Sequence, residues 1–153
     1  MTITAQAGLG WPQLAGIVGS FAASPQEWIG LVRLNAEGRW YERVYLGEDY
    51  DVWIITWLPG QATGFHDHGP SAGAFTVAWG ILEEHHDGTV ETVRAGTVRT
   101  FGPGPGYVHD VRNASAGPAV SVHAYSPPLT EMTRYDLTPD GLAARDTETE
   151  ASW

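Results

Sequence analysis

The sequence contains no cysteine among its 153 residues. Disulfide bonds, a thiolate nucleophile and a cysteine-ligated zinc site are therefore excluded. Basic residues are also scarce: 8 lysines and arginines stand against 18 acidic residues, and the formal net charge is -10. A surface that binds nucleic acid must neutralise phosphates, so this balance predicts that the protein has no nucleic-acid partner.

Long apolar runs are missing as well. No continuous apolar segment approaches the roughly 20 residues that a membrane-spanning helix needs. The N-terminal sequence MTITAQAGLGWPQLAG has no basic stretch leading into a long apolar run, so it lacks the pattern of a signal peptide. We therefore expect a cytoplasmic protein with no membrane partner.

Turn-forming residues, by contrast, are abundant. The chain has 19 glycines and 10 prolines, and 42% of its residues are hydrophobic. This composition is typical of a globular protein in which turns separate many short elements, and it favours an all-β sandwich or barrel over a helical bundle. A chain of this length fits one domain with a substantial core. We therefore predict a single domain over residues 1–153.

Helical signals are confined to the N-terminal third, at about residues 11–35. The sequence SPQE at residues 24–27 has the form of a capping box with proline at the first helical position, and apolar residues at 28–32 follow at roughly helical spacing. An earlier segment, residues 12–21, gives a weaker signal because two glycines interrupt it. One or two short helices are therefore expected before the strands.

Short β-rich segments make up residues 39–137. They are rich in aromatic and β-branched residues and are separated by turn formers: RWYERVYL, YDVWIITWL, AFTVAWGIL, TVETV, GTVRTF, GYVHDV and PAVSVHAY. Many short strands with closely spaced turn signals predict a β-barrel or jelly roll. Beyond Pro139 the sequence DGLAARDTETEASW is polar and acidic, which indicates a partly ordered tail.

Two histidines separated by one residue, His66 and His68, are the first chemical signal. In extended backbone, residues i and i+2 project from the same face, so both imidazoles can converge on one ion. Neutral imidazole is the commonest protein ligand for transition metals. An isolated H-x-H pair is about as often an ordinary surface or core pair, and the assignment therefore depends on the surrounding sequence.

The surrounding sequence matches two spaced motifs. GQATGFHDH at residues 60–68 fits the pattern G-x5-H-x-H, and GYVHDVRN at residues 106–113 fits G-x2-H-x3-N. In this order the two motifs resemble those of the cupin superfamily, over about residues 39–136. The resemblance implies a cupin jelly-roll barrel in which His66, His68 and His109 bind one metal ion.

One departure from the cupin pattern is informative. Gly73 stands where the first motif carries a glutamate, and three histidines without a carboxylate resemble the ligands of cysteine dioxygenase and related thiol dioxygenases. The sequence SVHAYSPP at residues 121–128 is similar to the signature strand of that family. Ser121, His123 and Tyr125 alternate, so their side chains share one face. The resemblance implies a hydrogen-bonded relay whose tyrosine reaches the substrate.

An arginine on an early strand is a second feature of this resemblance. The sequence WYERVYL at residues 40–46 is similar to the strand in which the family binds its substrate carboxylate, which implies this role for Arg43, beside Tyr41 on the same face. The alternative is a surface arginine paired with Glu42 or Glu48. Since the chain has no cysteine, it cannot form the cysteine–tyrosine crosslink of mammalian-type members, which bacterial relatives commonly lack.

Several neighbouring residues receive structural interpretations. His85 and His86 precede an Asp-Gly turn and are expected to be solvated turn residues. Asp67 lies between two predicted ligands and is expected to face away from the metal, where it can orient a neighbouring group. The bond at Ser126-Pro127 resembles a cis peptide of the family.

The resemblance implies an Fe(II) enzyme that adds both atoms of dioxygen to the sulfur of a small thiol, most simply converting L-cysteine to cysteine sulfinate. Oxidation of 3-mercaptopropionate, or of cysteine to a different biosynthetic product, would use the same site. A non-oxidative cupin, such as an isomerase or a binder of small carboxylates, is an alternative of another class. Three imidazoles alone suit iron, nickel, copper, manganese or zinc. A monomer or small homo-oligomer is expected.

Overall fold

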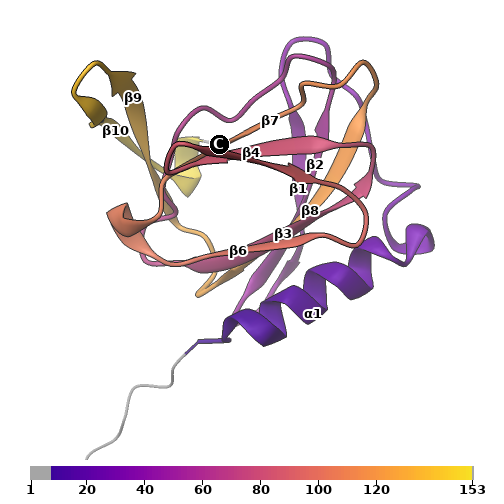
Figure 1. Ribbon diagram of the computed structural model, residues 1–153. Coiled ribbons are helices and arrows are strands. Elements are labelled where there is room, and N and C mark those ends of the chain that lie inside the picture. Colours follow the sequence, from indigo (N-terminus) through magenta and orange to yellow (C-terminus); the bar gives the residue numbers. More distant parts are fainter. Residues whose placement is uncertain (1–7, 153) are drawn as a thin grey trace, which may run out of the picture.

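The computed structural model describes residues 8–152 (Figure 1). One α-helix, α1, and a short 3-10 helix precede the strands, and two further 3-10 turns cover Gly104–Gly106 and Glu150–Ser152. In the described range the elements run in this order: α1 (Trp11–Ala22), the 3-10 helix (Pro25–Glu27), β1 (Trp40–Leu46), β2 (Asp51–Trp57), β3 (Ala72–Trp79), β4 (Leu82–His86), β5 (Thr89–Val93), β6 (Val98–Phe101), β7 (His109–Arg112), β8 (Ala119–Ser126), β9 (Glu131–Thr138) and β10 (Gly141–Thr149).

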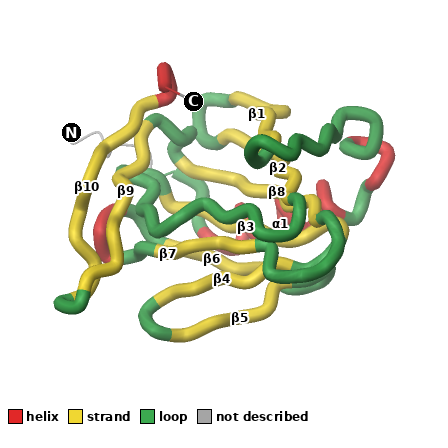
Figure 2. Tube along the Cα trace, turned by 90° about the horizontal axis from the view of Figure 1, so that it is seen from above, coloured by secondary structure: helices red, strands yellow, loops and turns green. Residues whose placement is uncertain are grey.

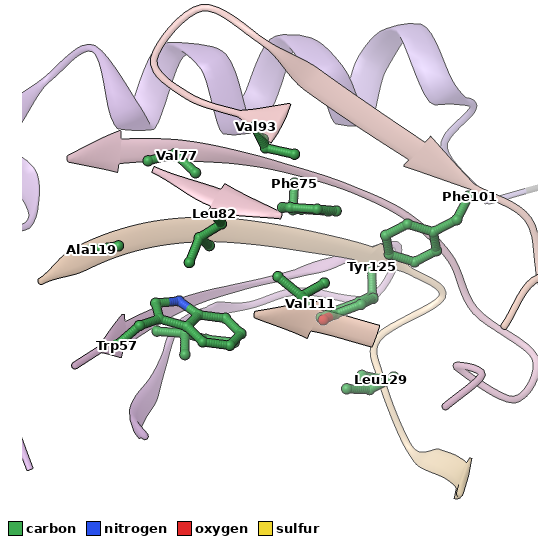
Figure 3. Close-up of a cluster of buried hydrophobic side chains, with 11 residues drawn as sticks. Trp57, Phe75, Val77, Leu82, Val93, Phe101, Val111, Ala119, Tyr125 and Leu129 are labelled. Atoms are coloured by element: carbon green, nitrogen blue, oxygen red, sulfur yellow. The ribbon is translucent and has the colours of Figure 1, made fainter. Parts of the chain in front are cut away.

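Two antiparallel sheets enclose the main core. The larger has the strand order β1-β2-β8-β3-β6 and the smaller has the order β5-β4-β7. Trp57 and Phe75 from the larger sheet meet Leu82 and Val111 from the smaller one, and each is at most 1% exposed (Figure 3). The segments rich in aromatic and β-branched residues that the sequence contains form these strands, and the predicted all-β barrel is confirmed.

The helix α1 covers the outer face of the larger sheet (Figure 1). Leu14 and Val18, one turn apart, are fully buried against Val52, Val122 and Ala124. This burial stabilises the helix despite its two glycines, because tertiary packing of an apolar face outweighs helix propensity. The weaker of the two predicted helical segments is therefore the α-helix of this fold.

The capping box at residues 24–27 does not begin an α-helix, and this prediction was wrong. It forms only the 3-10 helix Pro25–Glu27, and the Ser24 hydroxyl donates to the Ser20 carbonyl instead of accepting from a helix N–H. Of the apolar residues that follow the box, Trp28 is buried in the core, whereas Ile29 is 64% and Leu31 is 41% exposed, so no continuous helical face is buried. Without that burial a helix of this length is marginal.

The polar segment after Pro139 forms β10, which pairs with β9, rather than the partly ordered tail that its composition indicated. The resulting hairpin lies beside one end of the barrel (Figure 2). Its strand β9 is held by backbone hydrogen bonds from Asp67 N to Thr133 O and from Tyr135 N to Phe65 O. The C-terminal hairpin therefore docks on the segment that carries the two spaced histidines.

Within the described residues, no helix combines the length and the apolar character that crossing a membrane requires.

Candidate metal centre

Three buried histidines form the centre of the site. His66 and His68 lie in the extended segment between β2 and β3, and His109 begins β7. Two backbone hydrogen bonds join His66 to His109, at 2.9 and 3.1 Å between N and O. The ligand nitrogens of all three residues lie within 4.8 Å of one another, and none of the three residues is more than 4% exposed. This cluster fits a metal site.

The far side of each imidazole indicates which nitrogen faces the centre. His66 Nδ1 lies 2.8 Å from the Gly64 carbonyl, and His109 Nδ1 lies 2.7 Å from a carboxylate oxygen of Glu84. Both partners are acceptors, so both Nδ1 atoms carry the proton and leave Nε2 with a lone pair. His109 Nε2 and His68 Nε2 face each other at 3.3 Å. The Nε2 lone pair of His109 is therefore directed toward His68, and one cation could bind both rings at this point.

The protonation states of the histidines are those that metal ligands require. Burial, reinforced by the neighbouring histidines, lowers the pKa of His66 and of His68 well below the usual range, so both are neutral at pH 7. Neutral imidazoles bind divalent transition metals well, and a site with three protein ligands leaves positions for substrate. The donor set therefore fits the metal that the sequence predicted for His66, His68 and His109.

Glu84 is a residue of this site that sequence reasoning missed. It is fully buried on β4, where Arg99 Nε donates to Oε1 at 2.6 Å and the Tyr107 hydroxyl donates to Oε2 at 3.0 Å. Burial alone would raise the pKa of Glu84, but the hydrogen bonds from His109 and Arg99 outweigh it and lower that pKa to about 2. Alternation along β4 places Glu84 on the same face as buried Leu82, and this was the available signal.

Asp67 has the expected orientation, whereas His85 and His86 are strand residues and not the solvated turn residues that were predicted. Asp67 faces away from the cluster and accepts hydrogen bonds from Thr133 N at 3.2 Å and from the Tyr135 hydroxyl at 2.8 Å. His85 and His86 end β4 before the turn, and both are partly exposed. The ring of His86 also stacks on Tyr107, with centroids 3.8 Å apart.

The three residues expected as a relay share the inward face of β8. Ser121 Oγ lies 2.7 Å from His123 Nε2 and accepts a hydrogen bond from the Trp57 indole at 2.8 Å. Burial, with a contribution from His109, lowers the pKa of His123 to about 3, so this imidazole is neutral. The rings of His123 and Tyr125 are 6.4 Å apart, and no hydrogen bond joins them in the described structure.

Tyr125 lies at one end of the core cluster, next to Phe101 and Val111 (Figure 3). Its ring centroid is 5.3 Å from that of His68, and it lines the same cavity as the three histidines. Burial, with a contribution from the Asp51 carboxylate, raises the pKa of Tyr125 above its usual range, so the phenol keeps its proton. The Ser126-Pro127 bond that follows is cis, as the resemblance implied.

The structure places the two expected substrate-binding residues differently. Tyr41 lines the cavity, whereas Arg43 is not among the described residues that do so. The guanidinium of Arg43 lies over the Trp53 ring and is bound by Glu150 at 2.6 Å, with Asp51 3.7 Å away. Two carboxylates thus draw this side chain to the outside of the pocket, in agreement with a structural ion pair.

Two other arginines, which sequence reasoning missed, line the cavity. Arg134 is held by Glu148 at 2.9 Å and donates to the Thr63 carbonyl at 2.6 Å. Arg39 packs over the Trp57 ring at 5.2 Å, and no carboxylate of the described residues pairs with it. Arg39 immediately precedes β1, where no motif marks it, so only the fold reveals that it reaches the site.

The cavity between these residues is small, with a volume of about 80 Å³. Pockets for drug-sized ligands are usually several times larger. Its wall combines four imidazoles, the Tyr125 phenol and one guanidinium that has no carboxylate partner among the described residues, set among apolar side chains such as Ile55 and Leu129. The site can therefore hold a metal ion and a small anionic molecule together.

Comparison with known proteins agrees with this geometry. A family model described as cysteine dioxygenase type I matches residues 2–138. Among solved structures, a protein from Thermus thermophilus is 26% identical over 65% of this chain and 93% of its own, with a TM-score of 0.60. An uncharacterized double-stranded β-helix protein from Klebsiella pneumoniae is 24% identical, covers 77% of this chain and 93% of its own, and has a TM-score of 0.59.

A cupin-superfamily sugar phosphate isomerase from Silicibacter pomeroyi has the same fold. It is 17% identical, covers 75% of this chain and 78% of its own, and has a TM-score of 0.57. The predicted cupin barrel is confirmed by these likenesses. The family model extends much further than half of the chain, from the N-terminal segment to the end of β9. The chain therefore belongs to the cysteine dioxygenase type I family.

Proposed function

We propose that the protein is a thiol dioxygenase whose metal is Fe(II) and whose substrate is L-cysteine. The observation that carries this proposal is one small cavity that combines three convergent imidazoles, no ligating carboxylate, and an arginine without a carboxylate partner among the described residues. The reaction is RSH + O2 → RSO2H. The sulfur loses four electrons, dioxygen gains four, both oxygen atoms form bonds to sulfur, and no other reductant is needed.

His66, His68 and His109 would hold the metal through Nε2. When bound, the metal supplies a Lewis acid for the thiol and a route for electrons between sulfur and dioxygen. The three imidazoles are neutral ligands, so they leave the positive charge of the site uncompensated, and this charge favours the thiolate form of the substrate.

Arg39 is our candidate for binding the substrate carboxylate. A guanidinium presents a planar fork of donors that matches a carboxylate. Arg39 lies in the cavity, rests on Trp57 and has no carboxylate partner among the described residues, whereas Arg134 is already paired with Glu148. The role that the family resemblance implied for Arg43 is thus better supported for Arg39.

Tyr125 would act as a hydrogen-bond donor beside the reacting atoms. Its raised pKa keeps the hydroxyl protonated, so it stabilises negative charge on oxygen and does not serve as a base. Ser121 and His123 lie next along the same buried face of β8 and fix the wall against which the phenol packs.

Oxygen uptake by Fe(II)-loaded protein tests the proposal. L-cysteine, 3-mercaptopropionate and cysteamine are compared, and the product from ¹⁸O₂ is weighed by mass spectrometry. We expect uptake with L-cysteine and a product that carries two labelled oxygen atoms, and no uptake by His109→Ala. Cysteamine, which lacks a carboxylate, should be the poorest substrate.

If 3-mercaptopropionate is the preferred thiol, the proposed dioxygenase activity stands and L-cysteine is not the substrate. Absence of uptake with every thiol, in protein that binds one equivalent of iron, would overturn the proposal and leave a metal-binding cupin of other chemistry.

A further inference from the structure

The carboxylate of Glu84 is bound on both of its oxygens directly beside the histidine cluster. It is fully buried, and three donors from β6 and from residues at or just before the start of β7 reach it: His109 Nδ1 at 2.7 Å, Arg99 Nε at 2.6 Å and the Tyr107 hydroxyl at 3.0 Å. A buried carboxylate is costly to desolvate unless such partners surround it. The fold therefore holds a negative charge at a fixed point directly behind one predicted ligand.

The three predicted ligands differ in the hydrogen-bond partner of their Nδ1 atoms. His66 Nδ1 faces a neutral carbonyl, and His68 Nδ1 is buried beside the stacked ring of Phe101 with no hydrogen-bond partner among the described residues. Only His109 donates to an anion among the described contacts of the three histidines. Anionic character on one imidazole makes it a stronger electron donor than the other two.

The ligand sphere itself has no room for a carboxylate at the position where cupin motifs carry one. A Cβ atom on Gly73 would collide with the ring of Phe101 and would lie 2.9 Å from the Ala124 carbonyl oxygen. A glutamate side chain therefore does not fit at this position. The negative charge of the site lies on Glu84, which contacts the ligand His109 and not the metal position itself.

We propose that Glu84 is a positioning residue that acts on the metal through His109. It fixes His109 with Nδ1 protonated and Nε2 directed inward, and it supplies the negative charge that the ligand sphere lacks. Arg99 balances part of this charge from the opposite side of the carboxylate. This role rests on the proposed metal site. The charge of Glu84 tightens metal binding and favours the oxidised state of a redox-active metal.

Metal affinity tests the proposal without any thiol or turnover. Apoprotein is titrated with Co(II) against a competing chelator, for the wild type and for Glu84→Gln. Glutamine has nearly the same shape and no charge, so we expect the dissociation constant to rise about 10- to 100-fold. Glu83→Gln is the matched control, because Glu83 is on the same strand but faces outward and binds only His85 among its described partners. Unchanged affinity in folded Glu84→Gln would overturn the proposal.

The midpoint potential of the iron-loaded protein separates an electronic role from a merely structural one. Glu84→Gln should raise this potential, whereas Arg99→Gln should lower it, because more of the carboxylate charge then reaches His109. Shifts of the same sign in both variants, or no shift, would contradict the proposal. Arg99 is 31% exposed, so its variant carries the test if Glu84→Gln fails to fold.

The two proposals can fail separately. In one outcome the wild type binds metal and the two variants show opposed shifts in potential, while no thiol supports oxygen uptake. That outcome would support the role of Glu84 and contradict the proposed dioxygenase activity. Wild-type protein that binds no divalent metal would overturn both.

Discussion

The two arginines that line the cavity differ in their partners. Arg134 is neutralised by Glu148, whereas Arg39 rests on an aromatic face and pairs with no carboxylate of the described residues. Burial, with the nearby charge of Arg134, lowers the pKa of Arg39, but a guanidinium stays charged at any physiological pH. An anion that enters the cavity therefore meets an unbalanced positive charge at Arg39.

Replacement of this charge should show in substrate affinity. Arg39→Gln is expected to raise KM for L-cysteine about 10- to 100-fold, since one charge-assisted carboxylate interaction is lost. Arg43→Gln is the matched control, and its KM should stay within about threefold of the wild type because Arg43 binds Glu150 instead. Initial rates of oxygen uptake measure both constants. A larger effect at Arg43 than at Arg39 would reverse the assignment.

Asp51 is a buried acid whose two oxygens differ. Oδ2 accepts hydrogen bonds from the Trp53 indole and from Leu129 N, while Oδ1 has no partner among the described residues. Burial raises the pKa of Asp51 to about 6, although these hydrogen bonds and Arg43 oppose it. Because the folded pKa exceeds the unfolded one, the stability contribution is full below about pH 4 and is lost as the pH rises through 6.

Asp51→Asn should remove this dependence, since its amide oxygen can replace Oδ2. The unfolding free energy of the wild type relative to this variant should fall by up to about 3 kcal/mol between pH 4 and 7. Urea unfolding at several pH values measures the difference. A difference that stays constant or rises with pH would contradict the raised pKa.

At the site, the residues that belong to a local sequence motif could be predicted from the sequence. His66 and His68 alternate, and His109 has its own motif, so three residues from two segments could be placed together. Glu84 and Arg39 could not be found in this way. Each reaches the site from a segment without a motif, and only the pairing of β4 with β7 and the course of the chain before β1 bring them there.

At the scale of elements, the C-terminal hairpin depends on contacts that are distant in the sequence. β9 accepts a backbone hydrogen bond from Asp67 N and donates one to Phe65 O, and the Tyr135 hydroxyl donates to the buried Asp67 carboxylate at 2.8 Å. Composition alone made residues 140–153 look like a tail, because β10 is polar and exposed on both faces. The same limit explains the capping box at residues 24–27, because the local pattern could not show that Trp28 is buried while Ile29 and Leu31 stay exposed.

Tyr135→Phe should loosen the hairpin without unfolding the barrel. Loss of this one hydrogen bond costs about 1 kcal/mol, which corresponds to roughly fivefold faster exchange of the protected amides of β9. Hydrogen–deuterium exchange with mass spectrometry resolves this segment from the barrel strands. Leu137→Ala, at a position that is 69% exposed, should leave the rates unchanged. Equal protection in Tyr135→Phe would show that backbone hydrogen bonds alone hold the hairpin.

At the scale of the whole molecule, the metal would add a link between two segments that are distant in the sequence. Its ligands belong to the segment between β2 and β3 and to β7, which already meet at two isolated bridges, Ala62–Arg112 and His66–His109. A ligand that binds only the folded state stabilises that state by mass action.

Saturation with Fe(II) or Co(II) should therefore raise the melting temperature. At 100 times the dissociation constant the gain is about 2.7 kcal/mol, or roughly 5–10 °C for a chain of this size. Differential scanning fluorimetry with and without EDTA measures the shift. His109→Ala should melt at the same temperature in both conditions, and a metal-dependent shift in that variant would place the binding elsewhere.

The packing around Gly73 constrains how this centre can change by mutation. A carboxylate ligand at this position would require more than one substitution, because shortening Phe101 removes one obstruction and leaves the Ala124 carbonyl in place. Each intermediate sequence would carry either a cavity or a steric clash in the core. No single substitution therefore converts this centre from three protein ligands to four at position 73, and the ligand set is fixed by packing as well as by chemistry.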